Sequence, residues 1–292
     1  MFFLSFASSF MLACILQVAA VSHPAMRRAN VSAVTKMSST QLDEMVPYAH
    51  FASAAYYSPI MINAWKCGDF ADYVGYWPTK NTVVVTHEGT DPAKILADLT
   101  DANALTRRLD PTLFPGVDSN VEVHRGFADE HALTASIILK EVKSLISQYN
   151  AKSVTLIGHS LGAALAEIEC VFMALNLPSS IAIKGVTFGT PRVGNPAWAA
   201  LFDSLVPDFQ RINNKKDIVP IVPGRFMGFS HVQGEVHILS DGDAVQCPGE
   251  YSICDDDATD DQCTIKSVPN IFVGNPSDHL GPYQGVYMGL SP

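Results

Sequence analysis

The sequence has few charges, little positive charge and few cysteines. Of its 292 residues, 16% are charged, and 19 Lys and Arg stand against 29 Asp and Glu, for a formal net charge of −10. Clustered Lys and Arg are needed to bind nucleic-acid phosphates or strongly anionic membranes, so we expect neither as a partner. The hydrophobic content of 48% excludes wholesale disorder, and the length is sufficient for a large core.

The N-terminal segment is typical of an export signal. Residues 1–20 carry no charge and end in the small residues Ala19 and Ala20. A membrane span takes about 20 predominantly apolar residues, and this run is too mixed for one. We predict a signal peptide over residues 1–20, a flexible tail over 21–39 and an extracellular protein; a buried N-terminal helix and an uncleaved anchor are the alternatives. Asn30 begins the only acceptable Asn-x-Ser/Thr sequon and is the predicted glycosylation site.

Removal of that signal would leave five cysteines, an odd number. Cys170 lies in an apolar helical stretch and is predicted to be a buried free thiol. No C-x-x-C pair occurs, which disfavours zinc and thioredoxin-like sites. The other four cysteines can form two disulfides, and the sequence allows three pairings. We predict Cys254 with Cys263, which closes a short loop, and Cys67 with Cys247.

Residues 40–292 contain no repeat, linker or low-complexity block, so we predict one domain there. A β-branched run at 81–86 is of strand type. From residue 128 onward, helical stretches at 128–149 and 161–177 alternate with short apolar strands at 153–157 and 181–189. This alternation predicts an α/β fold whose predominantly parallel central sheet is covered by helices on both faces.

One stretch, about 101–120, fits neither the helical nor the strand period. It contains two prolines and several apolar residues, among them Leu105, Leu113 and Phe114. It is either a surface loop with a short helix or a mobile lid whose apolar face covers a site.

The pattern Gly158-His-Ser160-Leu-Gly162 is G-x-S-x-G. It follows the predicted strand at 153–157 and opens the predicted helix from Leu161. A strand–turn–helix of this kind presents a nucleophilic serine at the end of a sheet. The N–H of Leu161, at the helix N-terminus, would face a developing oxyanion.

A nucleophilic serine needs a base, and the base needs an acid to orient it. In α/β-hydrolase-like sheets these follow in the order Ser, Asp, His. Asp217 lies at a predicted strand end and is the favoured acid. His231, His237 and His279 are the candidate bases; His279 follows a turn-rich loop and is favoured over His231, whereas His237 lies within a predicted strand.

The chain resembles the class 3 lipases, the secreted filamentous-fungal type of α/β hydrolase. The signature lies at 154–163, and further matching segments extend over nearly all of residues 40–290: Ala52–Tyr56, Val123–Phe127, Phe188–Asn195, Asn214–Pro220 and His279–Tyr283. The resemblance implies an α/β-hydrolase fold with a mobile lid. It also implies that Ser160 is the nucleophile, His279 the base and Asp217 its orienting acid.

The segment His87-Glu88-Gly89-Thr90 is similar to the family's oxyanion strand, with Glu88 where Arg is usual. Thr90 would then supply the second oxyanion donor beside Leu161. The resemblance implies no metal, no cofactor and no stable protein partner, with acylglycerols at a lipid–water interface as the substrate.

Within the family, the segments around Thr90 and His279 look most like the secreted mono- and diacylglycerol lipases. The family resemblance makes residues 224–230 a wall of the cleft, so Phe226 and Phe229 on that wall and Phe114 on the lid would leave no room for a third acyl chain. We therefore expect a lipase for mono- and diacylglycerols. The alternatives are a general triacylglycerol lipase, a feruloyl-type esterase for soluble esters, and an inactive lipid-binding protein.

Overall fold

A single mixed sheet organises the chain. The computed structural model describes residues 34–57, 73–90, 94, 95, 97, 99, 105–248 and 260–289. Within these residues the sheet has eight strands in the order β1-β10-β9-β8-β7-β6-β3-β2. They are β1 Thr35–Lys36, β2 Tyr73–Trp77, β3 Thr82–His87, β6 Ser153–His159, β7 Ala182–Phe188, β8 Asp208–Asn214, β9 Glu235–Ser240 and β10 Asp243–Gln246.

The centre of the sheet is parallel and its edges are antiparallel. Strands β3, β6, β7, β8 and β9 pair in parallel, whereas β2, β10 and β1 pair antiparallel at the two sides. The register brings His87 beside Gly158 and His159 beside Phe188. The carboxyl ends of β3, β6 and β7 therefore meet at one edge, where ligands bind in open α/β sheets.

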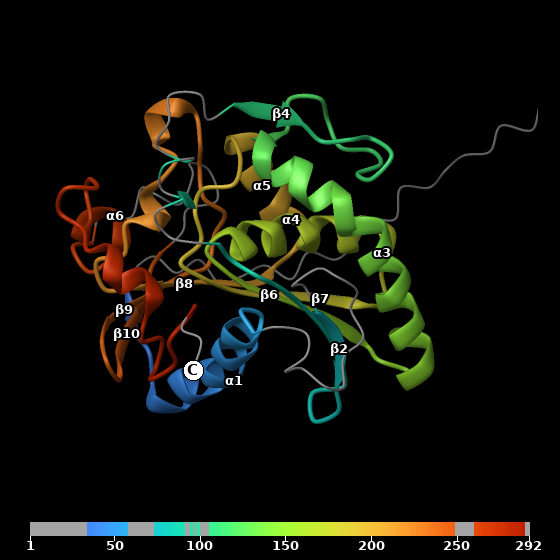
Figure 1. Ribbon diagram of the computed structural model, residues 1–292, viewed down its shortest axis with the longest axis horizontal. Coiled ribbons are helices and arrows are strands. Elements are labelled where there is room, and N and C mark those ends of the chain that lie inside the picture. The colour runs from blue at the N-terminus through green and yellow to red at the C-terminus, as the bar shows by residue number, and fades with distance from the viewer. Residues whose placement is uncertain are drawn as a thin grey trace, which may run out of the picture.

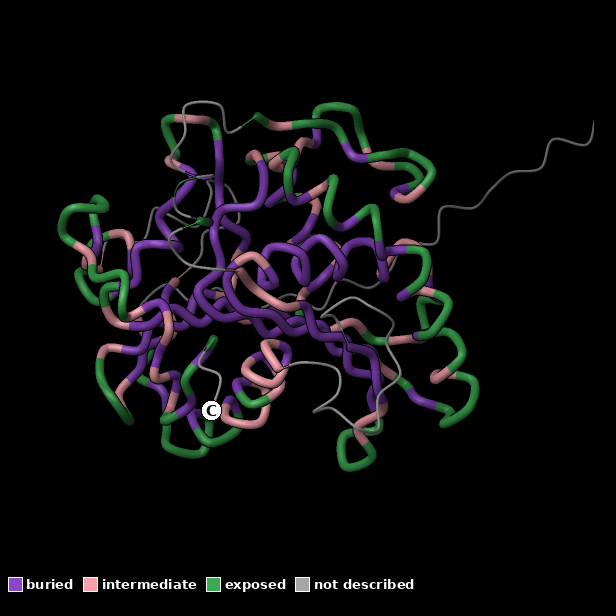
Figure 2. The backbone as a smooth tube through the Cα atoms, viewed as in Figure 1, coloured by how far each residue is buried: buried purple, intermediate pink, exposed green. Residues whose placement is uncertain are grey.

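Helices cover both faces of the sheet, as expected (Figure 1). Helix α1 (Ser39–Ala54) lies on one face, while α3 (Arg125–Tyr149), α4 (Leu161–Asn176) and α5 (Pro196–Leu205) lie on the other. Each layer has its own core, and the strands between them are buried (Figure 2). The short helix α6 (Thr264–Ser267), the 3-10 turns η1 (Val219–Ile221), η2 (Arg225–Met227) and η4 (Pro276–Leu280), and a two-stranded sheet of β4 (Thr106–Arg108) and β5 (Glu122–His124) complete the described elements.

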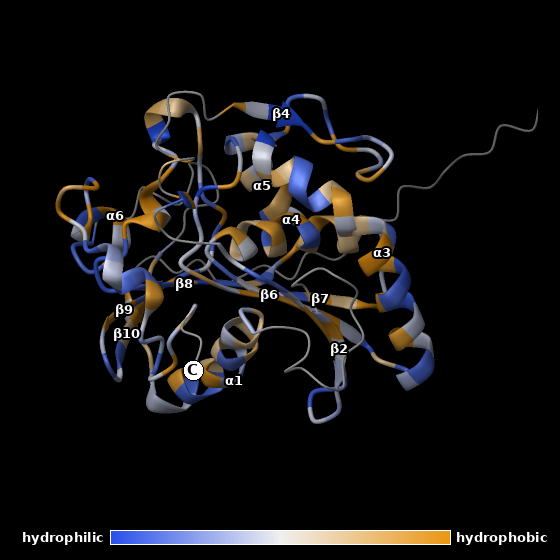
Figure 3. Cartoon of the chain, viewed as in Figure 1, coloured by the Kyte–Doolittle hydropathy of each residue, from blue (hydrophilic) through white to orange (hydrophobic). Residues whose placement is uncertain are grey.

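Helix α4 is interior because its sequence is apolar on nearly every side (Figure 3). It is buried continuously from Gly162 to Met173, between the sheet and the outer helix α3. Helix α3 is amphipathic, but not all of its apolar residues face the core. It buries Ile138 and Val142, whereas Leu133 and Ile137 are exposed. No helix of the described residues is both long and apolar enough to cross a membrane.

Residues 34–39, predicted as the end of the flexible tail, are part of the folded domain. Thr35 and Lys36 pair with β10, and Met37 is buried. Ser38 then caps α1: the Gln41 N–H donates to its hydroxyl, and the Gln41 side chain accepts from the Ser38 N–H. Residues 1–33, with the predicted signal peptide and Asn30, lie outside the described residues.

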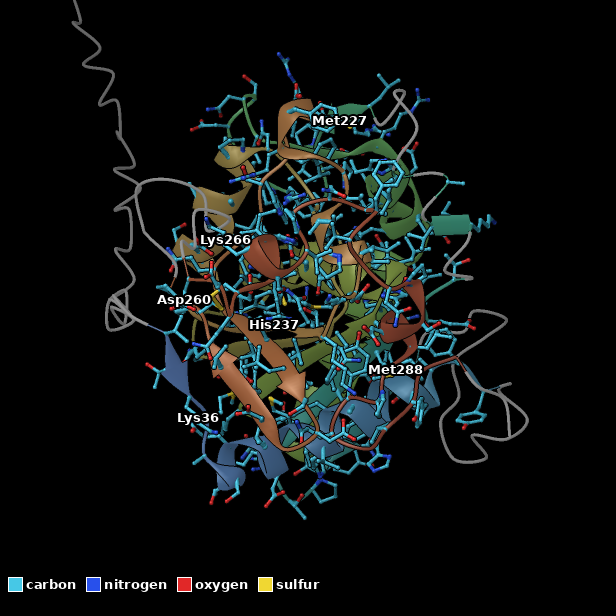
Figure 4. The ribbon with its side chains drawn as sticks, turned by 90° about the vertical axis from the view of Figure 1, so that its left-hand side faces the viewer. Lys36, Met227, His237, Asp260, Lys266 and Met288 are labelled. Carbon is cyan, nitrogen blue, oxygen red and sulfur yellow. A yellow bond between two sulfur atoms is a disulfide. The ribbon has the colours of Figure 1, made fainter. Side chains whose placement is uncertain are left out.

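The predicted disulfide pairings are wrong. Cys247, just after β10, bonds Cys263 at the start of α6, across a sequence separation of 16. Figure 4 views this side of the molecule, with His237 of β9 and Lys266 of α6 labelled. The predicted partners Cys67 and Cys254 lie outside the described residues. Cys170 is a buried free thiol, as predicted.

The part of the predicted lid that the structure describes, 105–120, packs against the body of the protein. Asp110 organises a turn by accepting from the N–H and hydroxyl of Thr112. Asn176 of α4 donates to the Leu113 carbonyl at 2.9 Å. Phe114 is 3% exposed, with its ring 5.7 Å from that of Phe172. Phe114 is therefore a core residue and not part of an apolar lid face, and Leu113 is partly buried against the same core. Leu105 is exposed.

Candidate active site

Ser160 lies on a sharp turn between β6 and α4. Its φ of 59° and ψ of −124° place a non-glycine residue in a sparsely populated conformation, as a nucleophile turn requires. Its N–H donates to the Phe188 carbonyl of β7 at 3.0 Å, which holds the turn against the sheet.

The two glycines of the motif permit this turn. A Cβ atom on Gly158 would lie 2.1 Å from the Gly162 carbonyl oxygen, and one on Gly162 would lie 2.2 Å from that of His87. No side chain fits at either position, so the pattern follows from the close approach of β6, α4 and β3.

The predicted acid and base are in contact. His279, in η4, donates from Nδ1 to Oδ2 of Asp217 at 2.8 Å. Asp217 follows β8, and its other carboxylate oxygen accepts from the Val219 N–H at 2.9 Å. Both side chains are buried. The carboxylate accepts the Nδ1 proton, which leaves Nε2 of His279 as the basic nitrogen.

Two reactive atoms at this site are buried without a hydrogen-bond partner in the described structure: Oγ of Ser160 and Nε2 of His279. Buried polar atoms are rarely left in this state, and those that are often belong to catalytic sites. This leaves a nucleophilic oxygen and a basic nitrogen available to a substrate.

The predicted oxyanion residues flank the nucleophile in the fold. Leu161 is the first residue of α4, so its N–H is one of the free donors of a helix N-terminus. Thr90 follows the end of β3, which pairs with β6 up to His87 and Gly158. A Cβ atom on Gly89 would lie 2.7 Å from the His159 carbonyl oxygen, so the segment before Thr90 runs directly beside the nucleophile strand.

The other candidate histidines make structural contacts. Nε2 of His231 lies 2.7 Å from the Pro220 carbonyl oxygen. The two ring nitrogens of His237 face the carbonyls of Lys215 and Gln262. His279 is hydrogen-bonded to Asp217, whereas these contacts of His231 and His237 are to backbone carbonyls.

The aromatic residues predicted to line the cleft do not form one wall. Phe229 is 1% exposed, with its ring centroid 6.1 Å from that of His124, and its role as a cleft residue stays a prediction. Phe226 is 92% exposed on η2, whose Met227 lies at the top edge of Figure 4. Loops without a regular period give no sequence signal for which aromatic faces inward.

Sequence reasoning assigned no role to His159 and Tyr56, which contact each other beside the predicted triad. The Tyr56 hydroxyl lies 2.6 Å from Nδ1 of His159. Burial, and then the neighbouring His279, hold the pKa of His159 well below its usual value. The only signal in the sequence was the position of His159 inside the G-x-S-x-G pattern.

The structure places a serine on a strained turn after β6, an aspartate after β8 and a histidine in η4. On a predominantly parallel sheet, this arrangement defines an α/β hydrolase. Residues 84–227 match the model of the class 3 lipase family. This match confirms the resemblance drawn from the motifs of the chain.

Known proteins of this kind are similar over much of the chain. A secreted mono- and diacylglycerol lipase of Malassezia restricta is 32% identical over 157 residues, 53% of this chain and 50% of the relative. A secreted alkaline triacylglycerol lipase of Penicillium cyclopium is 30% identical over 184 residues, 62% of this chain and 63% of the relative. The chain spans about half the length of the first relatives that it matches.

The fold agrees with that of solved fungal lipases. The structure of a Rhizomucor miehei lipase in a propeptide complex superimposes with a TM-score of 0.72 at 24% identity, covering 88% of this chain and 84% of that one. This likeness confirms the predicted α/β-hydrolase architecture.

Proposed function

We propose that this protein is a secreted serine lipase that hydrolyses acylglycerol esters at a lipid–water interface. The observation that carries the proposal is the hydrogen bond of 2.8 Å between His279 and Asp217, which leaves Nε2 of His279 buried without a partner, as is Oγ of Ser160. The match of residues 84–227 to the class 3 lipase family model supports the same reaction.

The reaction proceeds by two acyl transfers. As Oγ of Ser160 bonds to the ester carbonyl carbon, its proton passes to Nε2 of His279, and the carbonyl electron pair moves onto oxygen. The N–H groups of Leu161 and Thr90 hold that oxyanion. Collapse breaks the bond to glycerol, whose oxygen takes the proton from His279. Water then attacks the acyl-enzyme by the same route and releases the fatty acid.

The roles of Asp217 and His279 follow from their contact. Asp217 holds the imidazole in the tautomer with the proton on Nδ1 and stabilises the charged ring that forms during each transfer. These steps use side chains and backbone groups of the chain itself.

We infer mono- and diacylglycerols as the preferred substrates. Relatives of this chain named as secreted mono- and diacylglycerol lipases support this preference. The Penicillium relative, named a triacylglycerol lipase, supports the alternative. Burial of Phe114 in the core removes the lid side of the predicted aromatic wall as a reason for excluding a third acyl chain. Secretion is inferred from the same relatives' names, and mass spectrometry of the mature N-terminus tests it.

The decisive assay compares hydrolysis of emulsified mono-, di- and triolein with that of a dissolved short-chain ester. The purified wild type should cleave the emulsions, and a phosphonate inhibitor should label Ser160. Ser160→Ala should lower kcat by about 10⁴–10⁶ while leaving the fold intact. Activity on dissolved esters alone would favour the soluble-ester esterase, and triolein cleaved as fast as diolein would refute the substrate preference.

A further inference from the structure

His159 joins three segments of the active site through its ring. It is the last residue of β6, directly before Ser160, and it is fully buried. Nδ1 lies 2.6 Å from the Tyr56 hydroxyl, and Nε2 lies 2.8 Å from the backbone carbonyl oxygen of His279. The His159 ring also packs on that of His279, with centroids 4.4 Å apart.

The direction of both hydrogen bonds is determined by the chemistry of the partners. A carbonyl oxygen only accepts, so Nε2 of His159 must carry the proton, and Nδ1 then accepts from the Tyr56 hydroxyl. Burial lowers the pKa of His159 and raises that of Tyr56, with the charge of Glu88 raising the latter further. Both groups therefore remain neutral, and a single arrangement of protons satisfies the chain of hydrogen bonds.

At one end of this series of hydrogen bonds, Tyr56 contacts the segment that precedes Thr90. A Cβ atom on Gly89 would lie 2.0 Å from the Tyr56 hydroxyl oxygen, so the tyrosine packs directly on the backbone before Thr90. At the other end is His279, the predicted base, whose backbone carbonyl also accepts from the Tyr283 hydroxyl at 3.1 Å. The carbonyl of His279 is thus held by two donors from different parts of the chain.

We propose that Tyr56 and His159 are positioning residues that hold the backbone of His279 and the segment before Thr90 in place around Ser160. The inference rests on the proposed serine mechanism. Neither side chain exchanges a proton with substrate. They restrict where Nε2 of His279 and the Thr90 N–H lie, and a shift of about 1 Å in such groups costs on the order of 100-fold in rate.

The test measures kcat and KM separately on a dissolved short-chain ester. Tyr56→Phe keeps the ring and removes the donor, and it should lower kcat by roughly 10-fold with KM within about twofold. His159→Phe removes both bonds and should lower kcat by about 100-fold. His159→Gln, which can accept from Tyr56 and donate to the carbonyl, should recover part of that loss.

Tyr73→Phe is the matched control. The Tyr73 hydroxyl also donates to a backbone carbonyl, that of Phe51 at 2.7 Å, and Tyr73 lies on the edge strand β2, which β3 separates from β6 in the sheet. This variant should lose comparable thermal stability with kcat unchanged. The double variant Tyr56→Phe/His159→Phe should be no slower than His159→Phe, since His159→Phe already breaks the hydrogen bond that Tyr56→Phe removes.

The outcomes separate the inference from the proposed function. A wild type that neither hydrolyses esters nor reacts with a phosphonate at Ser160 would overturn the serine mechanism itself. If the wild type is active but folded Tyr56→Phe and His159→Phe keep its kcat, the positioning role is wrong. Fully additive losses in the double variant would contradict transmission through His159.

Discussion

The indole Nε1 of Trp198 donates a hydrogen bond of 2.8 Å to Oε1 of Glu167, deep in the layer between the sheet and α5. Glu167 is fully buried, and its second carboxylate oxygen has no hydrogen-bond partner in the described structure. Burial raises the pKa of Glu167 to about 8, although the bond from Trp198 and the charge of Arg211 oppose the shift. Because burial raises the pKa of this carboxyl group in the folded protein, Glu167 makes the free energy of unfolding depend on pH.

Glu167 should make the protein less stable as the pH rises from about 4.5 to 8. Over that window the unfolded chain has lost the proton that the folded protein retains, so the free energy of unfolding falls with pH and levels off above 8. The full effect has an upper bound of about 5 kcal/mol. Glu167→Gln retains an acceptor for Trp198 and should remove this dependence. Urea unfolding at pH 5 and pH 8 tests it, and equal pH slopes for both proteins would contradict it.

Asp217→Asn should lower kcat by about 10⁴ without unfolding the protein. An amide in place of the carboxylate can donate to Nδ1 of His279, which favours the tautomer with the proton on Nε2 and leaves no base for Ser160. The measurement is kcat on a dissolved ester, with circular dichroism to verify the fold. His231→Gln is the control, because Nε2 of His231 lies 2.7 Å from the Pro220 backbone carbonyl oxygen. Near-normal activity of the Asn variant would exclude Asp217 as the acid.

Phe114→Ala should destabilise the protein rather than widen its specificity. The Phe114 ring packs against His131 and Phe172, so truncation should cost about 3–5 kcal/mol of unfolding free energy. The exposed Phe226 is the comparison, and Phe226→Ala should change stability by less than about 0.5 kcal/mol. Denaturant unfolding and the diolein-to-triolein rate ratio are measured together. A stable Phe114→Ala variant with increased triolein activity would restore the cleft-wall interpretation.

Non-reducing peptide mapping should recover a fragment that joins Cys247 to Cys263. The bond closes a loop over a sequence separation of 16, and its loss should cost about 3 kcal/mol on the chain-entropy model. Unfolding of the reduced and alkylated protein measures that cost. A fragment joining Cys254 to Cys263 would favour the pairing predicted from the sequence instead.

Local patterns were sufficient to predict the architecture and the candidate triad. The G-x-S-x-G turn around Ser160 depends on five adjacent residues and on glycines that permit close packing, so it is visible in the sequence. The alternation of strands and helices is equally local, and it indicates the parallel sheet and the strand ends where Asp217 lies. His279 was less determined, since spacing alone left His231 open until the family resemblance was considered.

Only the tertiary structure decided which side chains in the irregular segments face inward. Phe114 is buried because α3 and α4 pack against it, and Phe229 is buried beside His124 at the end of β5, which is distant from it in sequence. Phe226, by contrast, is exposed. The bond between Cys247 and Cys263 depends on how α6 folds back beside β10, which no spacing of cysteines specifies. The sequence determined the turn, the sheet and the chemical groups because these follow from short-range sterics and periodicity. Burial, pairing and the contact between Tyr56 and His159 depend on long-range packing, so they could be known only from the folded chain.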